Sequence, residues 1–352
     1  MLGLREISRF DKEGLHKDYD NWARQAQEAL EIPFDLPEKP EFDHLVYVGM
    51  GGSGTAGDVL NDWLAPVWDK PLAVVKDFQL PAFVGKNSLV LLVSYSGETR
   101  EVLSSFKQAL DRGASLITIS SGGTLEKLAL RNKLPHLKVG KALTPRSGFA
   151  YLLYASLNVV SSLGLSHEAR SEIKESVRTI EDVFEDVSPK RELRRNFAKR
   201  LALWLSGSLS VIIAPSSMRG VATRFKNSLN ENAKMPALTM ILPESCHNDL
   251  EAITKKSKLV LKPVTIMDEA QGAEGDLAQR TLMRILGRAG LDSFDVTGRG
   301  KGRLSRLVSA LYTLEYATLY AAVARKIDPT PTPALKMFRE ILRSKLTPSM
   351  YG

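Results

Sequence analysis

Short apolar runs alternate with helical stretches through the first half of the chain. These runs are rich in β-branched residues and Leu and are apolar throughout, which is typical of strands covered on both faces. They predict strands at residues 44–48, 72–75, 88–94 and 115–120, after an amphipathic helix over residues 17–31. Strands that alternate with helices in this way favour a parallel, doubly wound α/β sheet.

The same alternation returns in the second half, after a highly charged helical stretch at residues 166–203. It predicts further strands at residues 209–213, 237–242, 258–261 and 293–296. We therefore expect two similar α/β subdomains, each a doubly wound parallel sheet flanked by helices. The predicted division is an N-terminal domain over residues 1–165, a helical connection over 166–203 and a C-terminal domain over 204–352.

The two halves also match each other at their first strand and turn. Residues 44–58 read HLVYVGMGGSGTAGD and residues 208–221 read SLSVIIAPSSMRGV, and each predicts a strand, a turn of small residues and the start of a helix. Only the first copy has a glycine-rich turn. We therefore expect the first half alone to bind an anion at this turn.

Composition excludes several classes of protein. The 352 residues are 43% hydrophobic and 25% charged, so the chain can bury a sizeable core. A single cysteine, Cys246, excludes a disulfide framework and predicts a reducing, cytoplasmic setting. Residues 147–166 are uncharged over a length that could span a bilayer, but recurring Ser, Asn and Gly favour a buried helix. The charges at Arg5 and Glu6 argue against a signal peptide, so no membrane contact is expected.

The formal net charge of +8 suits acidic partners, either phosphorylated metabolites or nucleic acid. The basic residues are spread along the chain, and the short runs at residues 190–200 and 299–303 are typical of solvated faces. No separate helix-turn-helix module precedes residue 45. The charge pattern therefore favours a small phosphorylated ligand over nucleic acid.

A glycine-rich turn, Gly-Met-Gly-Gly-Ser-Gly at residues 49–54, lies between the first predicted strand and a helix. Backbone N–H groups near Gly52 and the hydroxyl of Ser53 can meet an anion there, aided by the positive end of the helix. The spacing also fits a dinucleotide fingerprint formally, with Asp77 as the acidic ribose partner. The spacing alone leaves this alternative open.

The next loops favour one compact phosphate. The strand at residues 88–94 runs into the hydroxyls of Ser94, Ser96 and Thr99, and another strand ends at Ser120. Taken singly, each hydroxyl suits a turn or a helix cap. Taken together, they converge at the carboxyl ends of parallel strands, the usual ligand position in open α/β sheets. We predict that a sugar phosphate binds at Gly52, Ser53, Ser94, Ser96 and Thr99.

The motifs GMGGSGTAGD, VSYSGET and ITISSGG together resemble the sugar isomerase (SIS) domain family. TPRSGFA, LNENAKMPA, ESCHNDLEA and IDPTPTPALK resemble the archaeal-type bifunctional phosphoglucose/phosphomannose isomerases, so the resemblance covers residues 46–336 in order. It implies two SIS subdomains, hexose 6-phosphate substrates, an aldose-ketose isomerase that needs no cofactor, and a homodimer. A non-catalytic regulator that binds sugar phosphates is the alternative, because SIS domains also occur in such proteins.

The resemblance also implies catalytic roles for two residues. Arg146 precedes a long uncharged helix, where the helix dipole disfavours a cation, and it matches the arginine that stabilises the enediolate. Glu231 matches the base that carries a proton between C1 and C2, a task that suits a carboxylate. No cluster of His, Asp or Glu has the spacing of metal ligands, so no metal is expected.

Three further residues take their roles from the resemblance. His247 matches the histidine that opens the sugar ring from the partner subunit, and its imidazole titrates near neutrality. Lys336 matches a lysine that helps to open the ring, with Lys345 as an alternative. Thr330 matches a small residue that leaves room for rotation about C2–C3, with Thr332 as an alternative. That room would allow both glucose and mannose 6-phosphates as substrates.

Overall fold

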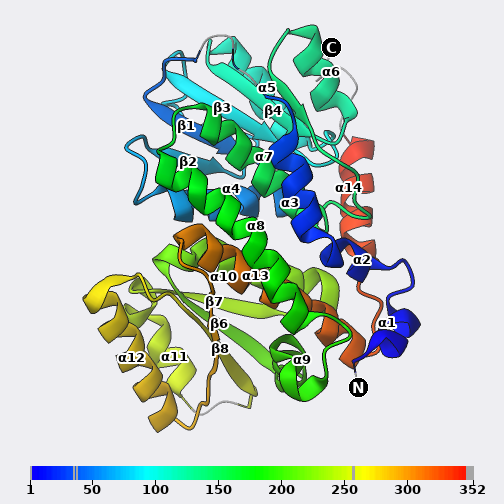
Figure 1. The fold of residues 1–352 in the computed structure, drawn as a ribbon, viewed down its shortest axis with the longest axis vertical. Helices are drawn as coiled ribbons and strands as arrows, with labels where there is room; N and C mark the ends of the chain where they lie inside the picture. Colours follow the sequence, from blue (N-terminus) through cyan, green and yellow to red (C-terminus); the bar gives the residue numbers. More distant parts are fainter. Residues whose placement is uncertain (1, 35, 37–38, 256–257, 346–352) are drawn as a thin grey trace.

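The structure, a computed structural model, describes residues 2–34, 36, 39–255 and 258–345. It contains two parallel sheets, one in the upper and one in the lower half of Figure 1. The first has the strand order β2-β1-β3-β4-β5 and the second β7-β6-β8-β9. The first sheet consists of β1 (His44–Val48), β2 (Leu72–Val75), β3 (Ser88–Val93), β4 (Ser115–Ser120) and β5 (His136–Lys138). These sheets confirm the predicted fold class.

The second sheet corrects one predicted strand. It consists of β6 (Leu209–Pro215), β7 (Ala237–Leu242), β8 (Leu261–Met267) and β9 (Phe294–Thr297). The prediction of a strand at 258–261 was wrong, because β8 begins where the predicted strand ends. Pro263, which lacks a backbone donor and argues against a central strand, is nevertheless buried inside β8 opposite Val211. The short strand β5 was not predicted.

Helices flank both sheets. Those before the second sheet are α1 (Leu4–Phe10), α2 (Leu15–Asp20), α3 (Trp22–Glu31), α4 (Gly52–Leu64), α5 (Arg100–Asp111), α6 (Gly123–Arg131), α7 (Phe149–Ser162), α8 (His167–Val187) and α9 (Phe197–Trp204). The later ones are α10 (Arg219–Ser228), α11 (Asp249–Thr254), α12 (Gly272–Arg288), α13 (Arg303–Ala324) and α14 (Pro333–Lys345). The helix expected at 17–31 is thus divided into α2 and α3 at Asn21.

One apolar core joins the two halves. It includes Trp63 of α4, Phe149 of α7, Phe225 of α10 and Tyr312 of α13, all at most 1% exposed. The charged stretch after residue 166 contributes to this core, because α8 and α9 both pack against α13. α7 is the expected buried helix. α13 is also long and apolar enough to cross a membrane, but 89% of its apolar window is buried, as in a core helix of a folded domain.

Candidate active site

Loops at the carboxyl ends of β1 and β3 form the first part of the site. Ser53 lies in the first turn of α4, and its Oγ accepts a hydrogen bond from the backbone N–H of Tyr95 at 3.3 Å. This bond holds the loop after β1 against the loop after β3. In the second loop the hydroxyls of Ser94 and Thr99 lie 2.8 Å apart, and Thr99 occupies the N-cap position of α5. Three of the predicted hydroxyls therefore meet at two helix N-termini, whose partial positive charge suits an anion.

The loop after β4 supports the second loop. A Cβ at Gly97 would stand 1.9 Å from the carbonyl oxygen of Gly122, so the two loops pack backbone to backbone. Thr124 donates its N–H to Glu98 at 2.8 Å and its hydroxyl to the same carboxylate. Ser96 is exposed, and its Oγ accepts the Glu98 N–H at 3.2 Å. The structure thus places Ser96 at the rim of the loop, whereas Ser53 and Ser94 are buried.

Gly52 joins the phosphate loop to the second part of the site. A Cβ at Gly52 would lie 3.1 Å from Nη1 of Arg224 and 3.7 Å from the Cα of Arg146. A side chain at this position would crowd both arginines. The predicted phosphate loop and the predicted catalytic arginine are therefore neighbours.

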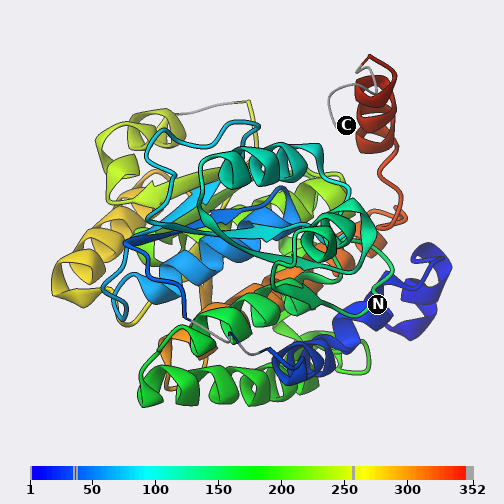
Figure 2. The ribbon, with the colours of Figure 1, turned by 90° about the horizontal axis from the view of Figure 1, so that it is seen from above.

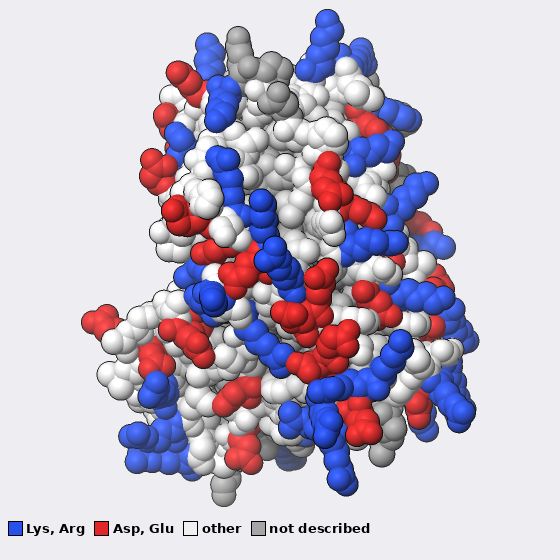
Figure 3. All heavy atoms as spheres, viewed as in Figure 1, with Lys and Arg blue, Asp and Glu red and all other residues white. Residues whose placement is uncertain are grey.

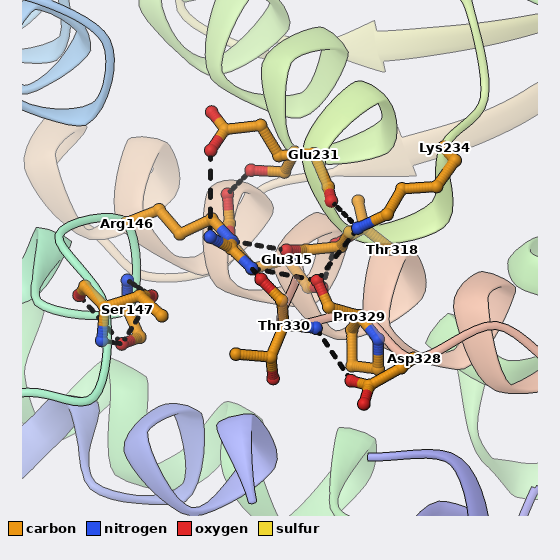
Figure 4. A network of polar contacts seen from close by, with 12 residues as sticks. Arg146, Ser147, Glu231, Lys234, Glu315, Thr318, Asp328, Pro329 and Thr330 are labelled. Carbon is orange, nitrogen blue, oxygen red and sulfur yellow. Dashed lines mark hydrogen bonds and ion pairs between the residues drawn. The ribbon is translucent and has the colours of Figure 1, made fainter. Parts of the chain in front are cut away.

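Arg146 is held on two sides by hydrogen bonds. Its Nε donates to Oδ1 of Asn232 at 2.8 Å. Its Nη2 donates to the carbonyl oxygens of Pro329 at 2.8 Å and Thr330 at 2.7 Å. Nη1 faces the carboxylate of Glu231, with Oε2 at 3.9 Å, as Figure 4 shows. These contacts fix the guanidinium so that one nitrogen points toward the predicted base.

Glu231 lies in a π-helix, Leu229–Ala233, which continues α10. Such turns are rare and often occur at functional sites. The Glu231 side chain is 25% exposed, against 7% for Arg146, so its carboxylate lies at the solvent-accessible side of the pair. A partly exposed carboxylate beside a fixed cation can accept and return a proton while the cation stabilises negative charge on a substrate oxygen.

Lys234 belongs to the same cluster, although the sequence did not single it out. Its Nζ donates to the carbonyl oxygen of Glu231 and, at 3.2 Å, to that of Pro329. Burial and the neighbouring Arg146 lower the pKa of Lys234 to about 8, against the opposing effect of Asp328. Its position three residues after Glu231 in the motif LNENAKMPA was the available signal.

A buried ion pair underlies the cluster. Nε of Arg224 lies 2.7 Å from Oε1 of Glu315, and each side chain is 1% exposed. The hydroxyl of Ser228 donates to the same carboxylate oxygen at 2.5 Å, and Nη2 of Arg224 donates to the carbonyl of Arg146 at 2.8 Å. Glu315 is the single charge in the apolar run at residues 307–324, a pattern that indicates a buried partner.

The structure places Thr330 beside Arg146 through its backbone. The Thr330 carbonyl binds Arg146, but in Figure 4 its side chain points away from Glu231. The residue is 6% exposed, and its hydroxyl has no hydrogen-bond partner within the described part of the chain. Its predicted effect on substrate choice stays a prediction.

The two residues expected to open the sugar ring make no hydrogen bond or ion pair with Arg146 or Glu231 in the described part of the chain. His247 is exposed in a short 3-10 helix, Glu244–His247, that follows β7. Lys336 is on α14, where its side chain is 80% exposed. The side chain of Lys345 lies outside the described residues. The ring-opening roles therefore stay predictions.

The turn after β6 corresponds to the predicted phosphate loop after β1, but its Ser217 hydroxyl binds a carboxylate of the protein itself. Asp268 is the first residue after β8, as Ser94 is the first after β3. It is 3% exposed and accepts hydrogen bonds from the Ser217 hydroxyl at 2.6 Å and the Ala270 N–H at 3.0 Å. This arrangement agrees with the expectation that only the first half binds an anion at this turn.

The chain is similar to several known proteins. The SIS domain family matches residues 41–134, and the bacterial phospho-glucose isomerase C-terminal SIS domain matches residues 194–342. A crystal structure of a glucose-6-phosphate isomerase like protein from Thermus thermophilus shares the fold, with a TM-score of 0.60, 17% identity and coverage of 95% of this chain and 99% of that one. Two parallel sheets with these matches define a protein built from SIS domains.

Two curated proteins are similar in sequence to this chain over most of its length. A bifunctional phosphoglucose/phosphomannose isomerase from Caldicellulosiruptor bescii is 30% identical, and the alignment covers 93% of this chain and 97% of the relative. A D-glucosamine-6-phosphate 4-epimerase from Sulfolobus acidocaldarius is 31% identical over 72% of this chain and 78% of the relative. The chain belongs to the bifunctional phosphoglucose/phosphomannose isomerase family.

Within the described ranges, no three His, Cys, Asp or Glu side chains come close enough together to hold a metal ion.

Proposed function

We propose that this protein interconverts glucose 6-phosphate and fructose 6-phosphate, and mannose 6-phosphate and fructose 6-phosphate. The observation that carries the proposal is the pairing of Glu231 with Nη1 of Arg146, 3.9 Å apart, next to Gly52 of the hydroxyl-rich loops. A sugar phosphate held at those loops would present its carbonyl end to the pair. Family membership supports both substrates.

The proposed reaction is a proton transfer through an enediol(ate). Glu231 removes the proton from C2 of the open-chain aldose and returns it to C1, while a proton moves between the two oxygens. Nη1 of Arg146 stabilises the negative charge on the enediolate, because its other nitrogens are held by the protein. The same enediol serves both aldoses, since glucose and mannose 6-phosphates differ only at C2.

We also propose that the chain acts as a homodimer. Figure 2 shows α14 protruding from the body, and its exposed apolar side chains suit a second copy. These side chains are Leu335, Met337, Phe338 and Ile341. The exposure of His247 and Lys336 supports roles for both in the partner's site. Sedimentation equilibrium measures this state, and an active monomer would contradict the proposal.

A coupled assay of the purified chain with each hexose 6-phosphate tests the function. We expect turnover of glucose and mannose 6-phosphates to fructose 6-phosphate, and Thr330→Gln to lose the mannose activity selectively. D-Glucosamine 6-phosphate is included because of the epimerase relative. If D-glucosamine 6-phosphate is turned over and glucose and mannose 6-phosphates are not, the isomerase proposal fails.

If the protein binds sugar phosphate without turning it over, the alternative function, a non-catalytic regulator that binds sugar phosphates, is favoured instead. On the face in view in Figure 3, basic and acidic side chains are interspersed, so this face offers no continuous basic patch to nucleic acid.

The phosphate loops give a separate prediction. In Ser94→Ala/Thr99→Ala, the two hydroxyls that lie 2.8 Å apart are lost, and we expect KM to rise roughly 10-fold or more because charge-assisted hydrogen bonds to the phosphate disappear. Steady-state kinetics measures this, with Thr254→Ala as the matched control, since that hydroxyl binds the carbonyl of Leu250 within α11. An unchanged KM in the folded double variant would show that the phosphate does not bind at these loops.

A further inference from the structure

Lys234 connects two segments that are about one hundred residues apart in sequence. Its Nζ binds the carbonyl of Glu231 in the π-helix and the carbonyl of Pro329 in the segment 328–330, which follows α13. Figure 4 shows the ammonium between these carbonyls, away from the Glu231 carboxylate. Lys234 therefore contacts the backbone around the site and not the proposed reacting groups.

The carbonyl of Pro329 has a second cationic partner. Nη2 of Arg146 binds it at 2.8 Å and also binds the next carbonyl, that of Thr330. The segment itself is closed by a hydrogen bond of 3.0 Å from the Thr330 N–H to Oδ1 of Asp328. These two carbonyls and Oδ1 of Asn232 together set the orientation of the guanidinium, and Lys234 binds one of the two carbonyls as well.

We infer that Lys234 is a positioning residue that fixes the segment 328–330, and through it directs Nη1 of Arg146 at the enediolate oxygen. This inference rests on the proposed function. Loss of Lys234 would leave the arginine bound to carbonyls that are no longer anchored to the π-helix that carries Glu231. Small displacements of a catalytic group lower the rate of the chemical step more than substrate binding.

The charge of Lys234 is sensitive to pH near neutrality. Its pKa of about 8 reflects burial and Arg146, which lower it, and Asp328 and Glu231, which raise it. Below pH 8 the ammonium carries three donors and a positive charge, and above pH 8 it loses both a donor and the charge. We therefore expect kcat to fall as the pH rises through about 8.

Two substitutions of Lys234 test the inference. Lys234→Met should lower kcat by about 10- to 100-fold with less than about 3-fold change in KM. Lys234→Arg should restore most of kcat and keep it above pH 8, because a guanidinium stays charged there. Lys133→Met is the matched control, since Lys133 has the same backbone φ of 54° at the end of α6 and an exposed side chain.

Hydrogen–deuterium exchange of a peptide covering the segment 328–330 supplies a readout that does not need activity. Exchange should be faster in Lys234→Met than in the wild type and unchanged in Lys133→Met. Equal exchange in all three proteins overturns the inference, whatever the substrate. An alkaline decline of kcat that Lys234→Arg leaves in place also overturns it, whereas an inactive wild type with faster exchange in Lys234→Met contradicts only the proposed function.

Discussion

Glu231→Gln is expected to lower kcat by about 100- to 10,000-fold, with KM close to that of the wild type. The amide has the shape of the carboxylate and can still face Nη1 of Arg146, but it cannot accept a proton. The buried carboxylate nearby, Glu315, cannot replace it, because Arg224 and Ser228 already bind it. Steady-state kinetics in both directions measures the loss.

Exchange of the C2 hydrogen with solvent separates proton transfer from binding. In deuterated water the wild type should incorporate deuterium at C2 of the aldose, and Glu231→Gln should not. Glu181→Gln makes the same chemical change at an exposed position on α8 and should behave as the wild type. Undiminished incorporation by Glu231→Gln would assign the base to another residue.

Glu315→Ala is expected to destabilise the protein by about 3–5 kcal/mol, because it leaves the Arg224 guanidinium buried without its partner. That loss is a large share of the roughly 5–15 kcal/mol by which domains are stable. Arg224 is 1% exposed, so water cannot replace the carboxylate without a local opening. Denaturant unfolding of the wild type and the variant measures the difference in the free energy of unfolding.

The double variant Arg224→Met/Glu315→Leu distinguishes the ion pair from packing. Apolar side chains of similar volume should restore most of the free energy of unfolding, because neither buried charge remains. The activity should stay low, since the bond from Arg224 to the carbonyl of Arg146 is lost. If Glu315→Ala is as stable as the wild type, the ion pair between Arg224 and Glu315 does not stabilise the fold.

The strand ends and helix starts that carry the predicted phosphate-binding residues could be predicted from the sequence, because their signals are local. Glycine and hydroxyl residues at a strand end, such as Gly52 and Ser94, report directly on a turn and a helix start. β8 was misplaced because Pro263 is a local signal against a strand, and the burial of that strand between β6 and β9 outweighs it. Local residue patterns therefore predict the turns, whereas the position of β8 depends on its neighbours in the sheet.

The remainder of the site depends on contacts between distant segments. Lys234 binds the carbonyl of Pro329, and Glu315 binds the side chain of Arg224. Neither pair of partners is close in sequence, so the sequence did not reveal these contacts. Lys336 was expected at the site, but α14 carries its side chain into solvent. Residue types and motifs singled out Arg146 and Glu231 as candidates, whereas the residues that hold them became visible only in the packing of α10 against α13.

Asp268 distinguishes the second sheet from the first, although the two sheets have the same order of their leading strands. Ser94 and Asp268 occupy corresponding places, each the first residue after the strand that adjoins the leading strand of its sheet. The first place offers hydroxyls at two helix N-termini to a phosphate monoester. In the second place the Asp268 carboxylate, which also lies 3.9 Å from Nε of Arg306, already accepts the hydrogen bonds of Ser217 and Ala270. We therefore expect the proposed substrate to bind with its phosphate toward the first sheet. The carboxylate of Asp268 thus makes the two corresponding turns of the repeated fold chemically different.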